Sequence, residues 1–332
     1  MVKSLTVLAV AAVFVAVPVL AQTTAPAVSE GNAARGAWQM PRTPEGKPSF
    51  EGDWVNNTFT PFERPDDLKD KAFFTAEEAK AYAERAIARQ KAQPADNIHY
   101  DDFIWMNESR LRSVTGSRTS IVQTADGKLP PMNAEGRARA QARAAARKRQ
   151  GGPADRVQNR ALSERCIIWP HEGPPMLPVG YNANIKIIQN AETIVIIQEM
   201  THNTRVIPLV PAPRLGETFR HWSGEPRGWW EDDTLVVVTT NYNGRTAWRG
   251  SSENLRVTER FTLVDADTIG YAFTVEDPAT WDTPWKGEIA ISKADGEIWE
   301  YACHEGNYGL RHILSAARVA DAEEAPARAP AR

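Results

Sequence analysis

Hydrophobic and polar residues alternate along much of the second half of the chain, and this pattern predicts a series of β-strands. A period of two residues places every second side chain on one face, so one face is buried and the other is solvated. The turns at 265–267 and 293–296 are short, and short connections force neighbouring strands to run antiparallel. The strands expected in this region are 234–240, 256–264, 268–275, 285–292 and 297–304.

Further strands are expected earlier in the chain, where apolar runs are separated by polar turns. They are 119–123, 185–189, 193–199 and 205–209. Ordered structure is expected to begin near Phe50, where Gly52 and Trp54 open a first strand in the way that lipocalin-like barrels begin. These segments predict a mainly β fold, an antiparallel β-barrel or strongly curled sheet built mainly from 185–304.

Two segments have helical patterns. Thr75 is a good N-terminal cap and is followed by acidic and spaced apolar residues, which predicts a helix over 76–90. Residues 134–150 are rich in alanine and arginine with almost no large apolar side chain, which favours a solvated surface helix over a nucleic-acid-binding arm. A terminal helical turn is expected within 313–319, and both longer helices are expected outside the barrel.

The chain is expected to form one domain. No internal repeat or linker divides it between Trp54 and Leu314, so residues 50–314 are expected to form a single β-rich domain with helical insertions. Residues 22–49 have the composition of a flexible leader. Residues 315–332, rich in Ala, Glu and Pro, have the composition of a disordered tail.

Residues 1–21 have the pattern of a signal peptide. Lys3 supplies the positive charge, an uncharged apolar run covers 5–20, and Val19 and Ala21 stand at the positions that precede a cleavage site. The apolar run is short for a membrane span, so cleavage is favoured over a retained N-terminal anchor. The mature protein is therefore expected to be periplasmic or secreted, without membrane attachment.

Charge and composition narrow the class of partner. The net charge is −3, with 42% hydrophobic and 24% charged residues, which is typical of a globular protein and gives no electrostatic case for binding nucleic acid. The chain has 11 Trp against 7 Tyr and 10 Phe, and this usage suits a small-molecule pocket and a barrel core equally. Composition does not determine the oligomeric state.

The chain has two cysteines, Cys166 and Cys303. An exported protein folds in an oxidising compartment, where a cysteine pair favours a disulfide over a metal site or a nucleophile. Two free buried thiols are the alternative. A bridge would draw His171 and Glu172, which follow the first cysteine, toward the residues that follow the second.

Polar residues gather where the expected strand 193–199 ends. A turn after this strand would bring Glu199 and His202 together, and His202 would then be a general base with Arg205 holding an anion. The alternative is a cross-strand ion pair between Glu199 and Arg205, with the histidine in a turn. Motifs for catalytic nucleophiles, phosphate loops and dinucleotides are absent, which favours proton-transfer chemistry.

A second cluster, His304 and Glu305, closes the expected strand 297–304. Strands that enter the same rim of a barrel place their ends together, so the two clusters are expected to share one pocket. The expected catalytic residues are Glu199, His202, His304 and Glu305, and the expected substrate-binding residues are Trp169, Tyr181, Arg205 and Tyr308.

No cofactor is expected at this pocket. The pairs 171–172 and 304–305 each contain a histidine and a glutamate, which are ligands for zinc or another divalent metal. Neighbouring residues on a strand point to opposite faces, so each pair offers at most one ligand unless it lies in a loop. A metal site is therefore the less favoured interpretation.

Five motifs stand out: LSERC at 162–166, MLP at 176–178, EDDTLVV at 231–237, RGSSENLR at 249–256 and YACHEGNY at 301–308. Together they resemble a family of uncharacterised exported β-rich proteins from environmental bacteria. The resemblance runs from about Gly52 to Leu314 and is consistent with a lipocalin-like barrel. The family has no assigned activity, so the resemblance implies no catalytic residue.

Two classes of function fit these features. The first is an exported enzyme that uses His/Glu acid–base chemistry in a barrel pocket, of the lyase, isomerase or hydrolase type, on a small aromatic or apolar substrate. The alternative is a non-catalytic periplasmic binding protein for a small apolar ligand, since a barrel of about eight strands encloses one such molecule. The crowding of His, Glu and Arg at strand ends favours the enzyme.

Overall fold

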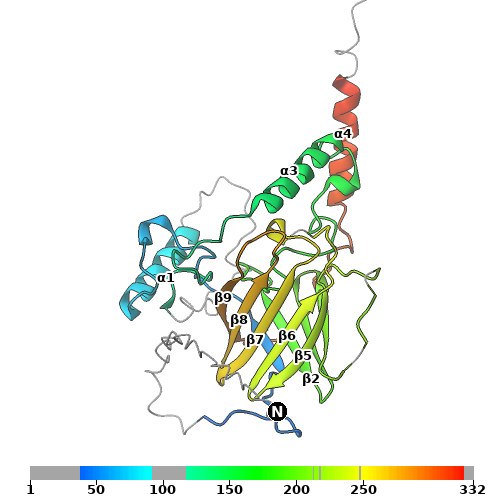
Figure 1. The fold of residues 1–332 in the computed structure, drawn as a ribbon. Helices are drawn as coiled ribbons and strands as arrows, with labels where there is room; N and C mark the ends of the chain where they lie inside the picture. The colour runs from blue at the N-terminus through cyan, green and yellow to red at the C-terminus, as the bar shows by residue number, and fades with distance from the viewer. Residues whose placement is uncertain (1–37, 92–116, 212, 217, 247, 325–332) are drawn as a thin grey trace, which may run out of the picture. The chain divides into compact units, whose positions relative to one another are not determined.

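The computed structural model describes residues 38–91, 117–211, 213–216, 218–246 and 248–324. Within this part of the chain, one nine-stranded antiparallel sheet curls into a nearly closed barrel (Figure 1). The strands are β1 (Gly52–Val55), β2 (Asn184–Gln189), β3 (Thr193–Gln198), β4 (Thr204–Pro208), β5 (Glu225–Glu231), β6 (Thr234–Thr240), β7 (Arg256–Asp265), β8 (Thr268–Glu276) and β9 (Trp285–Lys293). The predicted mainly β fold class is confirmed.

Strands that follow one another in the chain are mostly neighbours in the sheet. The order across the sheet is β4-β3-β2-β1-β9-β8-β7-β6-β5. The runs β2 to β4 and β5 to β9 are meanders, because each strand in them pairs antiparallel with the next strand along the chain. The short strand β1 pairs with β2 on one side and with β9 on the other, so it joins the two meanders.

The end strands β4 and β5 meet through their side chains. The seam between them is tight at Gly228 of β5, where a Cβ atom would lie 2.9 Å from both Ile207 Cγ2 and Leu209 Cδ2. A residue without a side chain therefore lets the two edges of the sheet approach each other. This close approach is what brings the sheet near to closure.

Large side chains fill the interior of the barrel. Along β8, Ile269, Tyr271, Phe273 and Val275 are buried and alternate with half-buried residues. Trp285 of β9 packs edge-on against Phe273, with ring centroids 6.0 Å apart. Each fully buried side chain of this size stabilises the fold by about 1.5–3 kcal/mol. The interior is a packed core, which differs from the ligand-holding cavity that the sequence led us to expect.

A buried ion pair lies within this core. The guanidinium of Arg205 donates to both carboxylate oxygens of Glu259, and both side chains are almost completely buried. The Tyr271 hydroxyl donates to the same carboxylate at 2.8 Å and accepts from the backbone N–H of Met176 at 2.9 Å. Burial opposes the charge of Arg205, but the attraction and hydrogen bonds of Glu259 outweigh it, so the pKa of Arg205 lies above its ordinary value.

Three helices lie in the described part of the chain: α1 (Ala76–Lys91), α3 (Ala134–Arg149) and α4 (Gly309–Glu324). The first two confirm the predicted helices. On α3, Arg139 and Arg143 donate to backbone carbonyls that include that of Gly250, so part of its basic face anchors the helix. None of the described helices is both long and apolar enough to cross a bilayer.

Two strand predictions were wrong. Residues 297–304 form no strand, because alternation favours extended backbone but a strand also needs a free sheet edge, and β9 is already flanked by β1 and β8. Residues 119–123 contribute only an isolated bridge, from Val122 to Gly287 of β9. Strand β5 was missed because it contains Pro226 and Gly228, which are unfavourable in strands but tolerated at an edge.

The two ends of the described region also differ from expectation. Residues 38–49, expected as part of a flexible leader, contain a turn, and Arg42 forms an ion pair with Asp233 at 2.8 Å. Helix α4 continues to Glu324, because alanine-rich sequence favours a helix, although residues 315–332 were expected to be disordered. The predicted signal peptide, residues 22–37 of the leader and residues 325–332 lie outside the described residues.

Candidate active site

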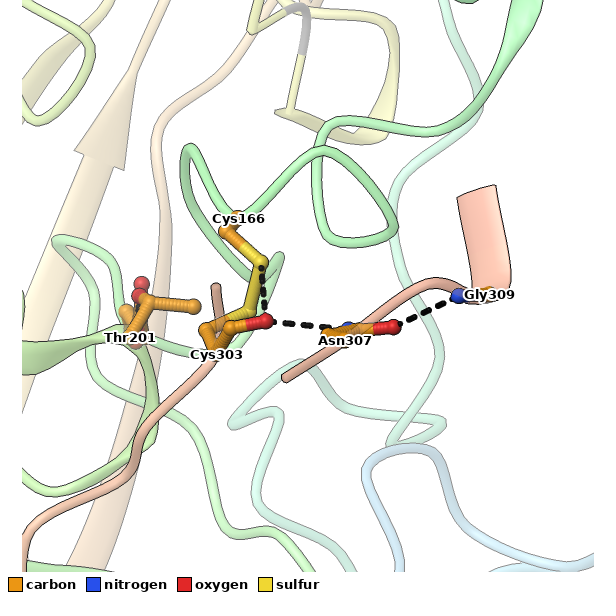
Figure 2. Close-up of a disulfide and its surroundings, with 6 residues drawn as sticks. Cys166, Thr201, Cys303, Asn307 and Gly309 are labelled. Carbon is orange, nitrogen blue, oxygen red and sulfur yellow. Dashed lines mark hydrogen bonds between the residues drawn. A yellow bond between two sulfur atoms is a disulfide. The ribbon is translucent and has the colours of Figure 1, made fainter. Parts of the chain in front are cut away.

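A disulfide brings two distant segments together. Cys166 and Cys303 are bonded, with Cα atoms 5.9 Å apart and a sequence separation of 137. The carbonyl of Cys303 accepts from the side chain of Asn307 at 2.9 Å, and Asn307 in turn accepts from the N–H of Gly309, where α4 begins (Figure 2). The bridge therefore holds the end of the 294–308 segment against the loop that follows Cys166.

The turn between β3 and β4 lies in the surroundings of this disulfide, where Figure 2 shows Thr201. Thr201 and His202 adopt φ angles of 54° and 51°, which is the left-handed region. A β-branched residue is rare there, because its branched side chain crowds the backbone. The turn is held from outside, since His202 Nε2 accepts from the N–H of Tyr301 at 3.0 Å.

Glu172 is the carboxyl group at the centre of the site. Its side chain is fully buried, and Oε1 accepts from the Thr201 hydroxyl at 2.7 Å. Its other oxygen, Oε2, accepts from the backbone N–H of Trp169 at 2.9 Å, and its backbone carbonyl accepts from the side-chain amide of Gln198. Burial raises the pKa of Glu172 to about 7, against the opposing effect of the hydrogen bonds from the Thr201 hydroxyl and the Trp169 backbone N–H. A carboxyl group with this pKa exchanges protons readily near neutral pH.

His171 precedes this carboxyl and is also largely enclosed. Burial lowers the pKa of His171 to about 4, so its imidazole is uncharged at neutral pH. Its ring lies 5.8 Å from that of Trp169, which meets Tyr181 edge-on at 6.5 Å. The residue that precedes Glu172 is therefore an uncharged imidazole that lies beside the ring of Trp169.

A small cavity of about 10 Å³, enough for about one water molecule, lies next to His171. Its polar lining comes from side-chain amides and this imidazole, in the residues Asn56, His171, Asn182, Asn184 and Gln198. The Oδ1 atom of Asn56 is buried and has no hydrogen-bond partner among the described residues. The cavity can therefore hold a small hydrogen-bond donor but not a substrate-sized molecule.

The first predicted cluster is divided between two environments. Glu199 is buried, and its carboxylate accepts from the side-chain amides of Asn182 and Asn184. Arg205 is not at the rim, because it faces the barrel core and pairs with Glu259. The predicted turn after β3 is present. However, Arg205 forms neither the predicted ion pair with Glu199 nor an anion-binding group at the rim.

The geometry of His202 limits its role. Its Nε2 atom accepts the Tyr301 N–H bond, so in the neutral ring the proton is on Nδ1. The nitrogen that would act as a general base is thus already occupied. His202 is exposed, and the remaining ring nitrogen is available as a donor.

The second predicted cluster lies on the surface. His304 and Glu305 are exposed, and among the described residues no hydrogen bond or ion pair joins either side chain to His202 or Glu199. Tyr308 is 60% exposed and contacts His312 edge-on at 6.2 Å. A pocket shared by the two clusters therefore stays a prediction.

The structure also identifies what sequence reasoning missed. The disulfide was expected to draw His171 and Glu172 toward the second cysteine, but Thr201 was not singled out. No local signal predicts a left-handed threonine, because its conformation depends on the contacts that hold the turn. The described residues contain no group of three His, Cys, Asp or Glu side chains arranged to hold a metal ion.

The fold and this site define a nearly closed β-barrel with a packed interior and a polar, disulfide-linked cluster of loops. No family model, curated protein or solved structure matches this chain.

Proposed function

We propose that this protein is an exported enzyme of acid–base type, with Glu172 as its proton-transfer group. The observation that carries the proposal is the fully buried carboxyl whose pKa lies near 7 and which accepts a hydrogen bond from Thr201. An ordinary surface glutamate is ionised at this pH and is a weak base, whereas a group with a pKa near the working pH both takes and returns a proton.

Thr201 gives this enclosed carboxyl a route to a bound molecule. Glu172 has no exposed surface, whereas Thr201, which donates to it, is half-buried, so in this proposal a bound molecule reaches the carboxyl through the threonine hydroxyl. A proton that arrives at Thr201 Oγ1 passes to Glu172 as the hydroxyl proton moves across the 2.7 Å hydrogen bond. The substrate in this proposal is small and uncharged, because the nearby rings of Trp169 and Tyr181 offer apolar contacts.

The proposed location is the periplasm or the exterior of the cell. The disulfide supports it, because such bonds persist in oxidising compartments. The sequence of residues 1–21 supports it independently as a cleaved signal peptide. The expected partner is a small molecule, with no nucleic acid and no resident cofactor.

A panel of chromogenic substrates tests the proposal: p-nitrophenyl acetate for acyl transfer, p-nitrophenyl glucoside for glycoside hydrolysis and 5-nitrobenzisoxazole for proton abstraction. We expect turnover of at least one, with a pH profile that inflects near 7. Glu172→Gln should lower the rate at least about 100-fold, the range of general acid–base catalysis. The control is Glu300→Gln, which changes an exposed carboxyl on the neighbouring segment and should have no effect.

The same assay separates this proposal from its alternatives. A rate that Glu172→Gln does not change would contradict the role of Glu172. If His304→Ala or Glu305→Gln abolishes turnover instead, the exposed cluster is the site. A binding protein would give no turnover in wild type, and the packed core means that its ligand would lie outside the barrel.

A further inference from the structure

We infer that Thr201 is a covalent nucleophile and that the site transfers acyl groups from small, uncharged esters or lactones. This inference rests on the proposed function, because it uses Glu172 as the base. It goes further in naming the reacting atom, the intermediate and the substrate class. No nucleophile motif in the sequence indicates it.

Thr201 and Glu172 have the geometry of a nucleophile and its base. A hydroxyl becomes nucleophilic when a base within about 2.6–3.2 Å accepts its proton as the new bond forms. Thr201 Oγ1 lies 2.7 Å from Glu172 Oε1 and donates to it. A threonine that served only to fill space would not need a buried carboxyl as its partner.

Glu172, the base of this pair, is itself held in a fixed orientation. Nucleophile–base pairs usually include a third group that fixes the base. Here the backbone N–H of Trp169 donates to Glu172 Oε2 at 2.9 Å, which leaves Oε1 directed at the threonine. Gln198, at the end of β3, donates to the backbone carbonyl of Glu172 and links the loop to the strand that leads into the turn.

The position of Thr201 in the fold also suits a nucleophile. Thr201 lies at the tip of the β3–β4 hairpin, whose last ladder pair is Ile197 with Thr204. Its φ angle of 54° is unfavourable for a β-branched residue, and such conformations persist where the surroundings impose them, often at active sites. Thr201 is half-buried whereas Glu172 is fully buried, so in this proposal an acyl group approaches the threonine hydroxyl while the base stays enclosed.

The side chains near Thr201 indicate which class of substrate the site can bind. Arg205 is committed to Glu259, and His171 is uncharged, so neither supplies a positive charge for a phosphate or carboxylate substrate. A neutral carbonyl compound is the better match. His202, the residue after the nucleophile, keeps a proton on Nδ1 and is therefore a donor for the oxygen that becomes negative.

The reaction balances with these groups alone. Thr201 Oγ1 attacks the ester carbonyl carbon while its proton moves to Glu172 Oε1. The ester C–O bond then breaks, and the departing alcohol takes that proton. Water attacks the acyl-threonine, gives a proton to Glu172 and forms the carboxylic acid. Thr201 leaves as its hydroxyl and recovers the proton.

A labelling experiment tests the inference on the full exported chain. The probe is an alkyl fluorophosphonate, which bonds to an activated hydroxyl and releases fluoride. We expect one label per chain, located by peptide mass spectrometry on Thr201, with a labelling rate that rises with pH and inflects near 7. Thr201→Val, which keeps the shape and removes the hydroxyl, and Glu172→Gln should both lower labelling at least about 100-fold. Thr201→Ser should keep it.

Thr204, an exposed threonine on the same hairpin, provides the matched control, because Thr204→Val should label like wild type. Circular dichroism and melting temperature establish that each variant is folded. Absence of label on wild type, or label that persists in folded Thr201→Val, overturns the inference.

Turnover of p-nitrophenyl acetate distinguishes failure of this inference from failure of the proposed function. Turnover that depends on Glu172 but survives in Thr201→Val refutes only the nucleophile, whereas turnover independent of Glu172 refutes the proposed function itself.

Discussion

At the scale of single residues, the neighbours His171 and Glu172 have opposite pKa shifts from the same physical cause. Burial disfavours charge, so it raises the pKa of Glu172 from 4.5 to about 7 and lowers that of His171 from 6.5 to about 4. Between these values both side chains are uncharged in the folded state. Relative to the unfolded chain, burial of Glu172 therefore weakens the fold at higher pH, and burial of His171 weakens it at lower pH.

Removal of Glu172 should change the pH dependence of stability in a defined direction. Below pH 4.5 the carboxyl is protonated in both states, and as pH rises toward 7 only the unfolded state ionises, which weakens the fold by about 3 kcal/mol. The free energy of unfolding of Glu172→Gln, minus that of wild type, should therefore rise by this amount from pH 4.5 to 7.5. Urea titrations at several pH values measure it, and a flat difference would contradict it.

Substitution of His171 should have the opposite slope. Above pH 6.5 the imidazole is neutral in both states, and as pH falls toward 4 only the unfolded state gains a proton, which weakens the wild-type fold by about 3 kcal/mol. The difference between His171→Gln and wild type should fall as pH rises from 4 to 6.5. The two effects oppose each other between pH 4.5 and 6.5. In this range, Glu172 and His171 together should therefore change the free energy of unfolding of wild type only slightly with pH.

At the scale of elements, the disulfide fixes the loop of Cys166, the 294–308 segment and the start of α4 relative to one another. Since 297–304 is not a strand, no ladder bonds hold this segment. The bridge and the hydrogen bond from the Tyr301 N–H to His202 Nε2 join this segment to the rest of the site. Loss of the bridge should therefore loosen the site more than the barrel.

The double variant Cys166→Ser, Cys303→Ser should be less stable by about 3–5 kcal/mol, because the bridge no longer restricts the unfolded chain across 137 residues. Urea unfolding measures the difference, and hydrogen exchange should show faster exchange at the Tyr301 amide with β7 and β8 unchanged. Added reductant is the control, since it should weaken wild type and leave the double variant unaffected. Equal stability with and without the bridge would contradict this account.

At the scale of the whole molecule, the buried pair of Arg205 and Glu259 joins β4 to β7 across the interior of the barrel. Glu259→Ala leaves a buried, unpaired guanidinium and should lower the free energy of unfolding by about 3–5 kcal/mol. Replacement of both partners by methionine should recover most of this loss, because two apolar side chains need no charge partner.

Arg256→Ala is the control for this prediction. It removes the solvent-exposed ion pair of Arg256 with Glu276 on neighbouring strands and should cost less than about 1 kcal/mol. Thermal and urea unfolding compare the four proteins. A double methionine variant as unstable as Glu259→Ala would show that the pair contributes more than charge compensation.

Much of the barrel could be predicted from local pattern. The alternation along Thr268–Glu276 and the short turn that precedes it specify an antiparallel neighbour without further information. Local pattern failed at 297–304, where alternation is present but the preceding strand β9 is already paired on both sides, and at β5, where Pro226 and Gly228 conceal an edge strand. In each case, strand formation depends on which other segment of the chain lies beside it in the sheet, and local sequence does not contain that information.

The mainly β fold class could be predicted from the chain alone, and a disulfide could be favoured, because strand periodicity and the number of cysteines do not depend on distant contacts. Which polar groups meet could be seen only in the folded molecule. Arg205 pairs with Glu259, 54 residues away, and Thr201 pairs with Glu172, 29 residues away. Such pairings depend on how the sheet closes and on the left-handed turn at residues 201–202, and both arise only when the whole chain packs.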